Sequence, residues 1–123
     1  MKGFVDNMAD WLRAAEVVVG KAGPGTIAEA ACCGVPLLLT GYVPGQEEGN
    51  AEFVIAAGSG RYTPSVEALI SEIERLCTDP AELAQVRAAA VRSSRGDAAR
   101  RVADLVVTLA GSSARVRSDR PGL

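Results

Sequence analysis

The chain has 123 residues and a mass of 12.7 kDa, which is enough for one domain or for one lobe of a larger enzyme. Its formal net charge of −2 argues against a general nucleic-acid-binding protein. Histidine is absent, so no mechanism that needs a histidine base or a histidine-ligated metal can run on this chain alone. Cys32, Cys33 and Cys77 lack a CxxC spacing, and we expect the adjacent pair to be small apolar residues of a helix.

Charge is distributed unevenly along the chain. Residues 1–86 carry 5 basic and 12 acidic side chains, a net of −7, and residues 87–123 carry 8 and 3, a net of +5. No apolar run approaches the ~20 residues of a membrane-spanning helix. The first residues also lack the pattern of a signal peptide. We therefore expect a cytoplasmic location.

Helix and strand patterns alternate in the first part of the chain. Asp6 or Asn7 can cap the first helix, whose core-facing stripe is expected to contain Met8, Trp11 and Leu12. Short β-branched and aliphatic runs predict buried strands. The expected elements are a helix over 7–14, a strand over 16–20, a helix from the glycine-rich turn to about Gly34 and a strand over 35–40.

The second part is expected to be mostly helical. Asp79 followed by Pro80 is typical of a helix start. The expected elements are a helix over 50–57, a strand over 61–63, and helices over about 65–77, 80–92 and 97–110. The last helix should turn its apolar residues inward, namely Val102, Leu105, Val106 and Leu109. Residues 111–123 are expected to form a disordered basic tail.

Strands that alternate with helices predict an α/β fold with a Rossmann-like parallel sheet flanked by helices. Three strands are few for such a sheet, because parallel strands need cover on both faces. We therefore expect residues 1–110 to be the C-terminal half of a larger domain, with upstream strands missing.

Ligands of open α/β sheets bind beyond the carboxyl ends of the strands, and two loops of this chain should lie there. The first contains Lys21, Gly23, Gly25 and Thr26. The N–H groups and the dipole at the start of a helix suit a diphosphate. The pattern is neither a Walker A loop nor a GxGxxG fingerprint. A tight turn that only packs helix against strand is the alternative.

Three other polar residues could bind sugar hydroxyls. Glu29 follows Thr26 by about one helical turn, where its carboxylate could bind both hydroxyls of a ribose. The second loop carries Gln46 and Glu47 between glycines, which suits contact with a hexose. The alternatives are an ordinary exposed glutamate for Glu29, a solvated loop for Gln46 and Glu47, and helix capping alone for Asn50.

Three ordered motifs carry a specific resemblance. GFVDNM at 3–8, KAGPGTIAEA at 21–30 and GYVPGQEEGN at 41–50 resemble the monogalactosyldiacylglycerol synthases. More broadly they resemble the C-terminal, sugar-nucleotide-binding lobe of GT-B glycosyltransferases, a group that includes the peptidoglycan lipid-intermediate GlcNAc transferase. The resemblance extends from about Lys2 to Ala110. It implies that this chain is the C-terminal half of a GT-B donor domain.

The resemblance also implies roles for individual residues. Backbone groups of Phe4 and Val5 would pair with uracil, and Glu29 would bind the ribose. Gln46 and Glu47 would bind the hexose, with Gly49 and Asn50 along the diphosphate. The diphosphate itself would lie on Lys21, Gly23, Pro24, Gly25 and Thr26.

The function that follows is donor binding in a UDP-sugar-dependent hexosyltransferase. Galactose is the favoured hexose and diacylglycerol the favoured acceptor, with no metal and no cofactor. In this family the acceptor site and the catalytic base belong to an N-terminal lobe, so we assign no catalytic residue and expect no turnover from this chain alone. A non-catalytic UDP-sugar-binding module acting with a separate lobe, and a UDP-GlcNAc-type donor domain, are the alternatives. The basic C-terminal segment could contact the missing lobe or anionic lipid at the inner face of a membrane, or be a solvated helix face.

Overall fold

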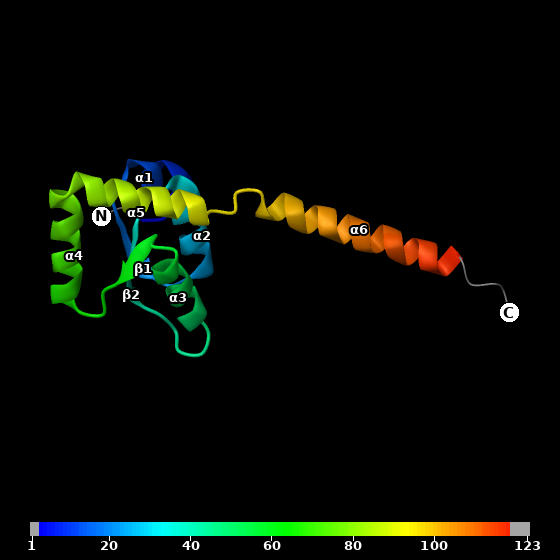
Figure 1. Cartoon of the computed structure of the whole chain (residues 1–123), viewed down its shortest axis with the longest axis horizontal. Helices are drawn as coiled ribbons and strands as arrows, with labels where there is room; N and C mark the ends of the chain where they lie inside the picture. Colours follow the sequence, from blue (N-terminus) through cyan, green and yellow to red (C-terminus); the bar gives the residue numbers. More distant parts are fainter. Residues whose placement is uncertain (1–2, 119–123) are drawn as a thin grey trace.

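The computed structural model describes the backbone of residues 3–118 and the side chains of residues 3–111. Helices and strands alternate up to β3, after which the chain is helical (Figure 1). The elements are α1 Met8–Ala14, β1 Val18–Lys21, α2 Pro24–Cys33, β2 Leu37–Gly41, α3 Glu48–Ala56, β3 Gly60–Tyr62, α4 Val66–Thr78, α5 Pro80–Ser93 and α6 Ala98–Ser118. None of the helices in the described part of the chain is both long and apolar enough to cross a membrane.

The three strands form a parallel sheet in the order β1-β2-β3. Val18 pairs with Leu37, and Leu38 with Arg61. Parallel neighbours need a crossover connection, which α2 supplies between β1 and β2 and α3 between β2 and β3. The expected α/β class with a parallel sheet is therefore confirmed. All three strands end at the same edge of the sheet, where the two predicted loops follow β1 and β2.

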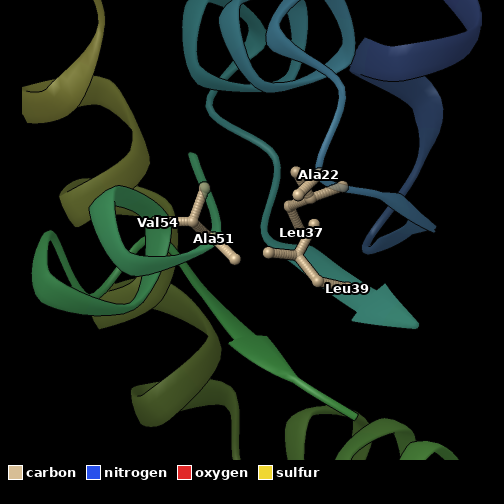
Figure 2. Close-up of a cluster of buried hydrophobic side chains, with 5 residues drawn as sticks. All are labelled: Ala22, Leu37, Leu39, Ala51 and Val54. Atoms are coloured by element: carbon tan, nitrogen blue, oxygen red, sulfur yellow. The ribbon is translucent and has the colours of Figure 1, made fainter. Parts of the chain in front are cut away.

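The central strand β2 is buried on both faces of the sheet. Leu37 and Leu39 point to one face and Leu38 to the other, as strand geometry requires. On the first face Leu37 and Leu39 pack against Ala22, in the turn after β1, and against Ala51 and Val54 of α3 (Figure 2). On the second face Leu38 packs against Leu76 of α4 and Val86 of α5. Cover on both faces explains why the first three residues of this strand, Leu37 to Leu39, are all apolar.

Local signals set several helix ends where the sequence predicts them. Gly34 ends α2 in the left-handed conformation, with φ of 68°. Ser65 caps α4 by accepting from the N–H of Ala68 at 3.2 Å. Asp79 caps α5 by accepting from the N–H groups of Ala81 and Glu82, at 2.9 and 3.0 Å. The Ser65 and Asp79 side chains bond to N–H groups no more than three residues away, and Gly34 acts through its own backbone, so all three signals can be read from the local sequence.

Three details of the early helices differ from expectation. Of the stripe expected on α1, only Leu12 is buried, and Met8 and Trp11 are about half exposed. Cys32 is exposed rather than packed among apolar neighbours. The helix expected to begin at Asn50 begins at Glu48. Periodicity predicted the stripe of α1 and the apolar composition of α2 predicted the place of Cys32, but no neighbouring element covers either surface fully.

The last helix corrects two expectations. Val102, Leu105, Val106 and Leu109 were expected inward, yet each is 57–62% exposed, and Figure 1 shows α6 extending away from the body of the domain. The helix also continues to Ser118, into the segment that was expected to be a tail from residue 111. Glycine and serine only weaken a helix, and the first proline after them is Pro121. Residues 119–123 of the expected tail lie outside the described residues.

Candidate functional site

The loops that follow β1 and β2 meet through an ion pair. Lys21 Nζ lies 2.9 Å from Glu47 Oε1. The two side chains differ in exposure, since that of Lys21 is 65% exposed and that of Glu47 is 10% exposed. Two predicted site residues, separated by 26 positions in the chain, are thus in direct contact.

Glu47 also closes the second loop on itself. Its Oε2 accepts a hydrogen bond from the N–H of Val43 at 2.9 Å, and its own N–H donates to the Val43 carbonyl at 2.9 Å. Gly45 lies within this turn at φ of 75°, a conformation that favours glycine. The hydrogen bond from Lys21 and then that from the Val43 N–H lower the pKa of Glu47. The carboxylate is therefore ionised at neutral pH and already has a donor on each oxygen.

The start of α2 is open to a ligand. Gly23 is the N-cap residue, Pro24 follows it, and no side chain caps this end. Pro24 has no N–H, and the N–H groups of Gly25 and Thr26 belong to the first turn, which has no intrahelical acceptor. A Cβ at Gly25 would meet nothing within 4 Å. An anion can therefore approach this backbone closely.

Predicted site residues converge on Gly23. A Cβ built there would lie 3.9 Å from Glu47 Oε1, from Lys21 Cε and from Thr26 Oγ1. The turn is tight, because the Gly23 N–H donates to the Lys21 carbonyl at 2.8 Å. The lysine side chain, the hydroxyl, the Glu47 carboxylate and the start of α2 thus surround one point. The cation, the hydroxyl and the N–H groups of this helix start are groups that can bind a diphosphate.

Asn50 fastens α3 to this turn. Its Nδ2 donates to the carbonyl of Ala22 at 3.1 Å. The N-cap position of α3 is Glu47, and no side chain caps that helix. The alternative reading of Asn50 as a helix cap is therefore wrong. Its contact holds the two loops in register, beside the Lys21–Glu47 pair.

The other predicted site residues are exposed around this centre. Glu29 lies on α2, one turn beyond Thr26, and Gln46 and Gly49 lie in and just after the second loop, all exposed to solvent. Near the start of the chain, Phe4 is fully exposed and Val5 is half-buried. No hydrogen bond recorded in the described residues joins Phe4 or Val5 to the two loops. Their assignment to uracil, like the other assigned roles, stays a prediction.

Two tyrosines that the sequence analysis did not single out support the second loop. The rings of Tyr42 and Tyr62 lie 5.5 Å apart, centre to centre, with 42° between their planes. Tyr42 directly follows β2 and Tyr62 ends β3. Aromatic residues at the ends of two neighbouring parallel strands were the signal that could have predicted this pair.

A groove with a volume of about 270 Å³ lies beside the site, between α2, α3 and the segment that joins α5 to α6. Pro24 and Asn50 are the predicted site residues that line it, next to Ile27 and Phe53. The groove therefore begins at the start of α2. Among the side chains described, those of residues 3–111, no group of three or more histidine, cysteine, aspartate or glutamate residues is placed to hold a metal ion.

Comparison with known proteins identifies close relatives. The chain is 48% identical over 65 residues to monogalactosyldiacylglycerol synthase 3, chloroplastic, of Arabidopsis thaliana. The aligned segment covers 53% of this chain and 14% of the relative. It is 38% identical over 99 residues to the probable monogalactosyldiacylglycerol synthase, chloroplastic, of Glycine max. This alignment covers 80% of this chain and 19% of the relative. The enzyme of Spinacia oleracea gives 36% over 99 residues, with the same coverage. The chain thus spans about a fifth or less of the length of these relatives.

The family assignment rests on a longer match. Residues 1–102 match the model of the glycosyltransferase family 28 C-terminal domain. That segment contains all three strands and every predicted site residue. The parallel sheet flanked by helices agrees with the fold that the resemblance implied. This chain belongs to the glycosyltransferase family 28 C-terminal domain family.

Proposed function

We propose that this chain is the donor-binding part of a UDP-sugar-dependent hexosyltransferase that transfers galactose to diacylglycerol. The family match supports glycosyl transfer, and the names of the relatives support galactose and diacylglycerol. The observation that carries the proposal is the uncapped start of α2, with Lys21 and Thr26 beside it. This is a site for a diphosphate, the group that joins the uridine to the sugar.

Stabilisation of the leaving group is the chemical role that this geometry supports. When the bond from the sugar to the diphosphate breaks, negative charge accumulates on the departing UDP. The N–H groups of Gly25 and Thr26, the helix dipole and the Lys21 ammonium group face that charge. The N–H groups and the helix dipole are in place before the donor binds, and the exposed Lys21 side chain needs only to turn toward the diphosphate, so little reorganisation is needed. Glu29 would hold the ribose and Gln46 the hexose.

The acceptor site and the catalytic base would come from another part of the enzyme. Neither histidine nor an assigned catalytic residue is present in this chain, and we expect the chain alone to bind the donor without turnover. An N-terminal acceptor lobe is the proposed partner. We further propose a cytoplasmic location with peripheral contact at the inner face of a membrane, supported by the arginines and the exposed apolar face of α6.

Calorimetric titration of the chain with UDP, UDP-galactose and ADP tests the proposal. The two uridine ligands should bind, and ADP should bind at least tenfold more weakly. Glu29→Ala should weaken UDP binding by roughly tenfold, since a hydrogen bond to a charged group contributes about 1.5–3 kcal/mol. Glu52→Ala removes an exposed carboxylate from α3 and is the matched control.

Three results of this titration would contradict parts of the proposal. Equal affinity for UDP and ADP would contradict uridine recognition, and unchanged UDP binding in Glu29→Ala would contradict the ribose assignment. A preference for UDP-GlcNAc over UDP-galactose would contradict the choice of hexose and leave the reaction class intact.

A further inference from the structure

The Lys21–Glu47 pair joins one movable group to one fixed group. The Glu47 carboxylate is nearly buried and is held by the N–H of Val43 as well as by Lys21. The Lys21 side chain is 65% exposed, and Glu47 Oε1 is its recorded partner. The long side chain of a lysine can rotate toward solvent at little cost. A competing anion would therefore move Lys21 and leave Glu47 in place.

A diphosphate at the start of α2 would be such an anion. Lys21 Cε and Glu47 Oε1 are both 3.9 Å from the position of a Gly23 Cβ, at the residue that caps α2. A phosphate oxygen bound by Gly25 and Thr26 would thus lie within the reach of the ammonium group. A diphosphate carries more charge than one carboxylate, and the helix dipole holds it in place.

We propose that Lys21 changes partner when a nucleotide sugar binds: it leaves Glu47 for the diphosphate, and the Glu47 oxygen that it vacates accepts a hydrogen bond from a hydroxyl of the sugar. This inference rests on the proposed function. It adds a direct link between the recognition of the phosphate and the recognition of the sugar.

The link follows from the burial of Glu47. Oε1 loses its donor when Lys21 departs, and a nearly buried carboxylate oxygen without a donor is costly. UDP alone has no group to replace the lysine at this place. A UDP-sugar brings hydroxyls to it. The sugar therefore contributes to affinity through the oxygen that the diphosphate has uncovered.

Two substitutions should affect UDP binding differently if this exchange occurs. Lys21→Met removes the cation from the diphosphate and should weaken UDP binding by roughly tenfold. Glu47→Gln retains an acceptor for the Val43 N–H but no longer holds Lys21 as an ion pair. It should leave UDP binding unchanged or tighten it up to about fivefold. Glu48→Gln removes a charge from the adjacent, exposed residue and is the matched control. It should change the affinities for UDP and for UDP-galactose by no more than twofold.

The ratio of the affinities for UDP-galactose and UDP supplies the second half of the test. In the unmodified chain UDP-galactose should bind several-fold more tightly than UDP, and in Glu47→Gln the two should bind equally. Weaker UDP binding in Glu47→Gln, by a factor similar to that in Lys21→Met, would overturn the exchange and indicate a fixed structural pair. An unchanged ratio in Glu47→Gln would also overturn it. If the unmodified chain binds no uridine ligand, the proposed function fails and takes this inference with it.

A measurement on the unmodified chain avoids any loss of folding in the variants. The carboxyl ¹³C signal of Glu47 can be followed against pH with and without saturating UDP. The lowered pKa of Glu47 has the Lys21 hydrogen bond as its first cause, and Lys21 is the charged group in contact with it. Departure of Lys21 should therefore raise the pKa of Glu47 when UDP binds. An unchanged or lower pKa of Glu47 in the UDP complex would overturn the exchange.

Discussion

At Gly60 the backbone of β3 lies against β2 without room for a side chain. A Cβ there would overlap the carbonyl oxygen of Leu37 and lie 2.7 Å from Val54 Cγ1. Gly60→Ala should lower the free energy of unfolding by about 3 kcal/mol, since neither a strand backbone nor a buried valine can give way cheaply. Urea unfolding followed by circular dichroism measures the change.

Gly20 is the matched control for Gly60. It lies in the neighbouring strand β1, and a Cβ there meets nothing within 4 Å. Gly20→Ala should therefore change the free energy of unfolding by less than about 1 kcal/mol. Similar losses in the two variants would mean that the close approach of β3 to β2 is not what makes Gly60 necessary.

The Lys21–Glu47 pair predicts a dependence of stability on pH. The pKa of Glu47 is lowered in the folded chain, chiefly by the hydrogen bond from Lys21. A carboxyl group with a lowered folded-state pKa stabilises fully above its unfolded pKa, about 4.3 for glutamate. That stabilisation is lost as pH falls through the folded-state value. The unmodified chain should thus be more stable than Lys21→Met at pH 7, by a margin that shrinks as the solution is made more acidic.

Urea unfolding of both proteins between pH 7 and pH 3 measures this margin. Arg13→Met is a suitable control, since it removes a cation whose own ion pair with Asp10 is exposed on both sides. A margin between the unmodified chain and Lys21→Met that stays constant over this range would contradict a role for the Glu47 charge.

At the scale of elements, the sequence predicted what depends on neighbouring residues. Asp79 with Pro80 identified the start of α5, and the aliphatic run of β2 identified the central strand, because caps and burial patterns are local. The start of α3 was missed by two residues. Its first turn contains Gly49, a poor helix former, and the contact that holds Asn50 is made to Ala22, 28 residues earlier.

For the candidate site, too, the sequence predicted the local features and missed the long-range contacts. Spacing alone identified the loops and placed both at the carboxyl ends of neighbouring strands, because parallel topology dictates that placement. It did not predict that Glu47 would be nearly buried with a donor on each oxygen. Pairing across 26 residues depends on the register of β1 with β2, including the irregularity between Gly20 and Lys21. Such contacts carry no sequence pattern of their own.

At the scale of the whole molecule, α6 has an exposed apolar face and lies in the positively charged part of the chain. Val102 and Leu105 are 62% and 57% exposed, and residues 87–123 carry a net charge of +5 against −7 for the rest. A helix with one apolar face and flanking arginines can lie in the interface of an anionic bilayer. The acidic remainder of the chain would be repelled from the same surface. In the proposed contact, this polarity would orient α6 toward the lipid and the domain away from it.

Sedimentation with vesicles tests this contact on the whole chain. The chain should bind vesicles rich in phosphatidylglycerol and not vesicles of phosphatidylcholine, and binding should weaken as salt screens the arginines. Val102→Asp with Leu105→Asp should reduce binding at least tenfold, because two charges would enter the apolar face. Val107→Asp is the matched control, since Val107 is 71% exposed but lies on the opposite side of the helix. Equal binding by the two variants, or no binding of the unmodified chain to either vesicle, would contradict a lipid contact through this face of α6.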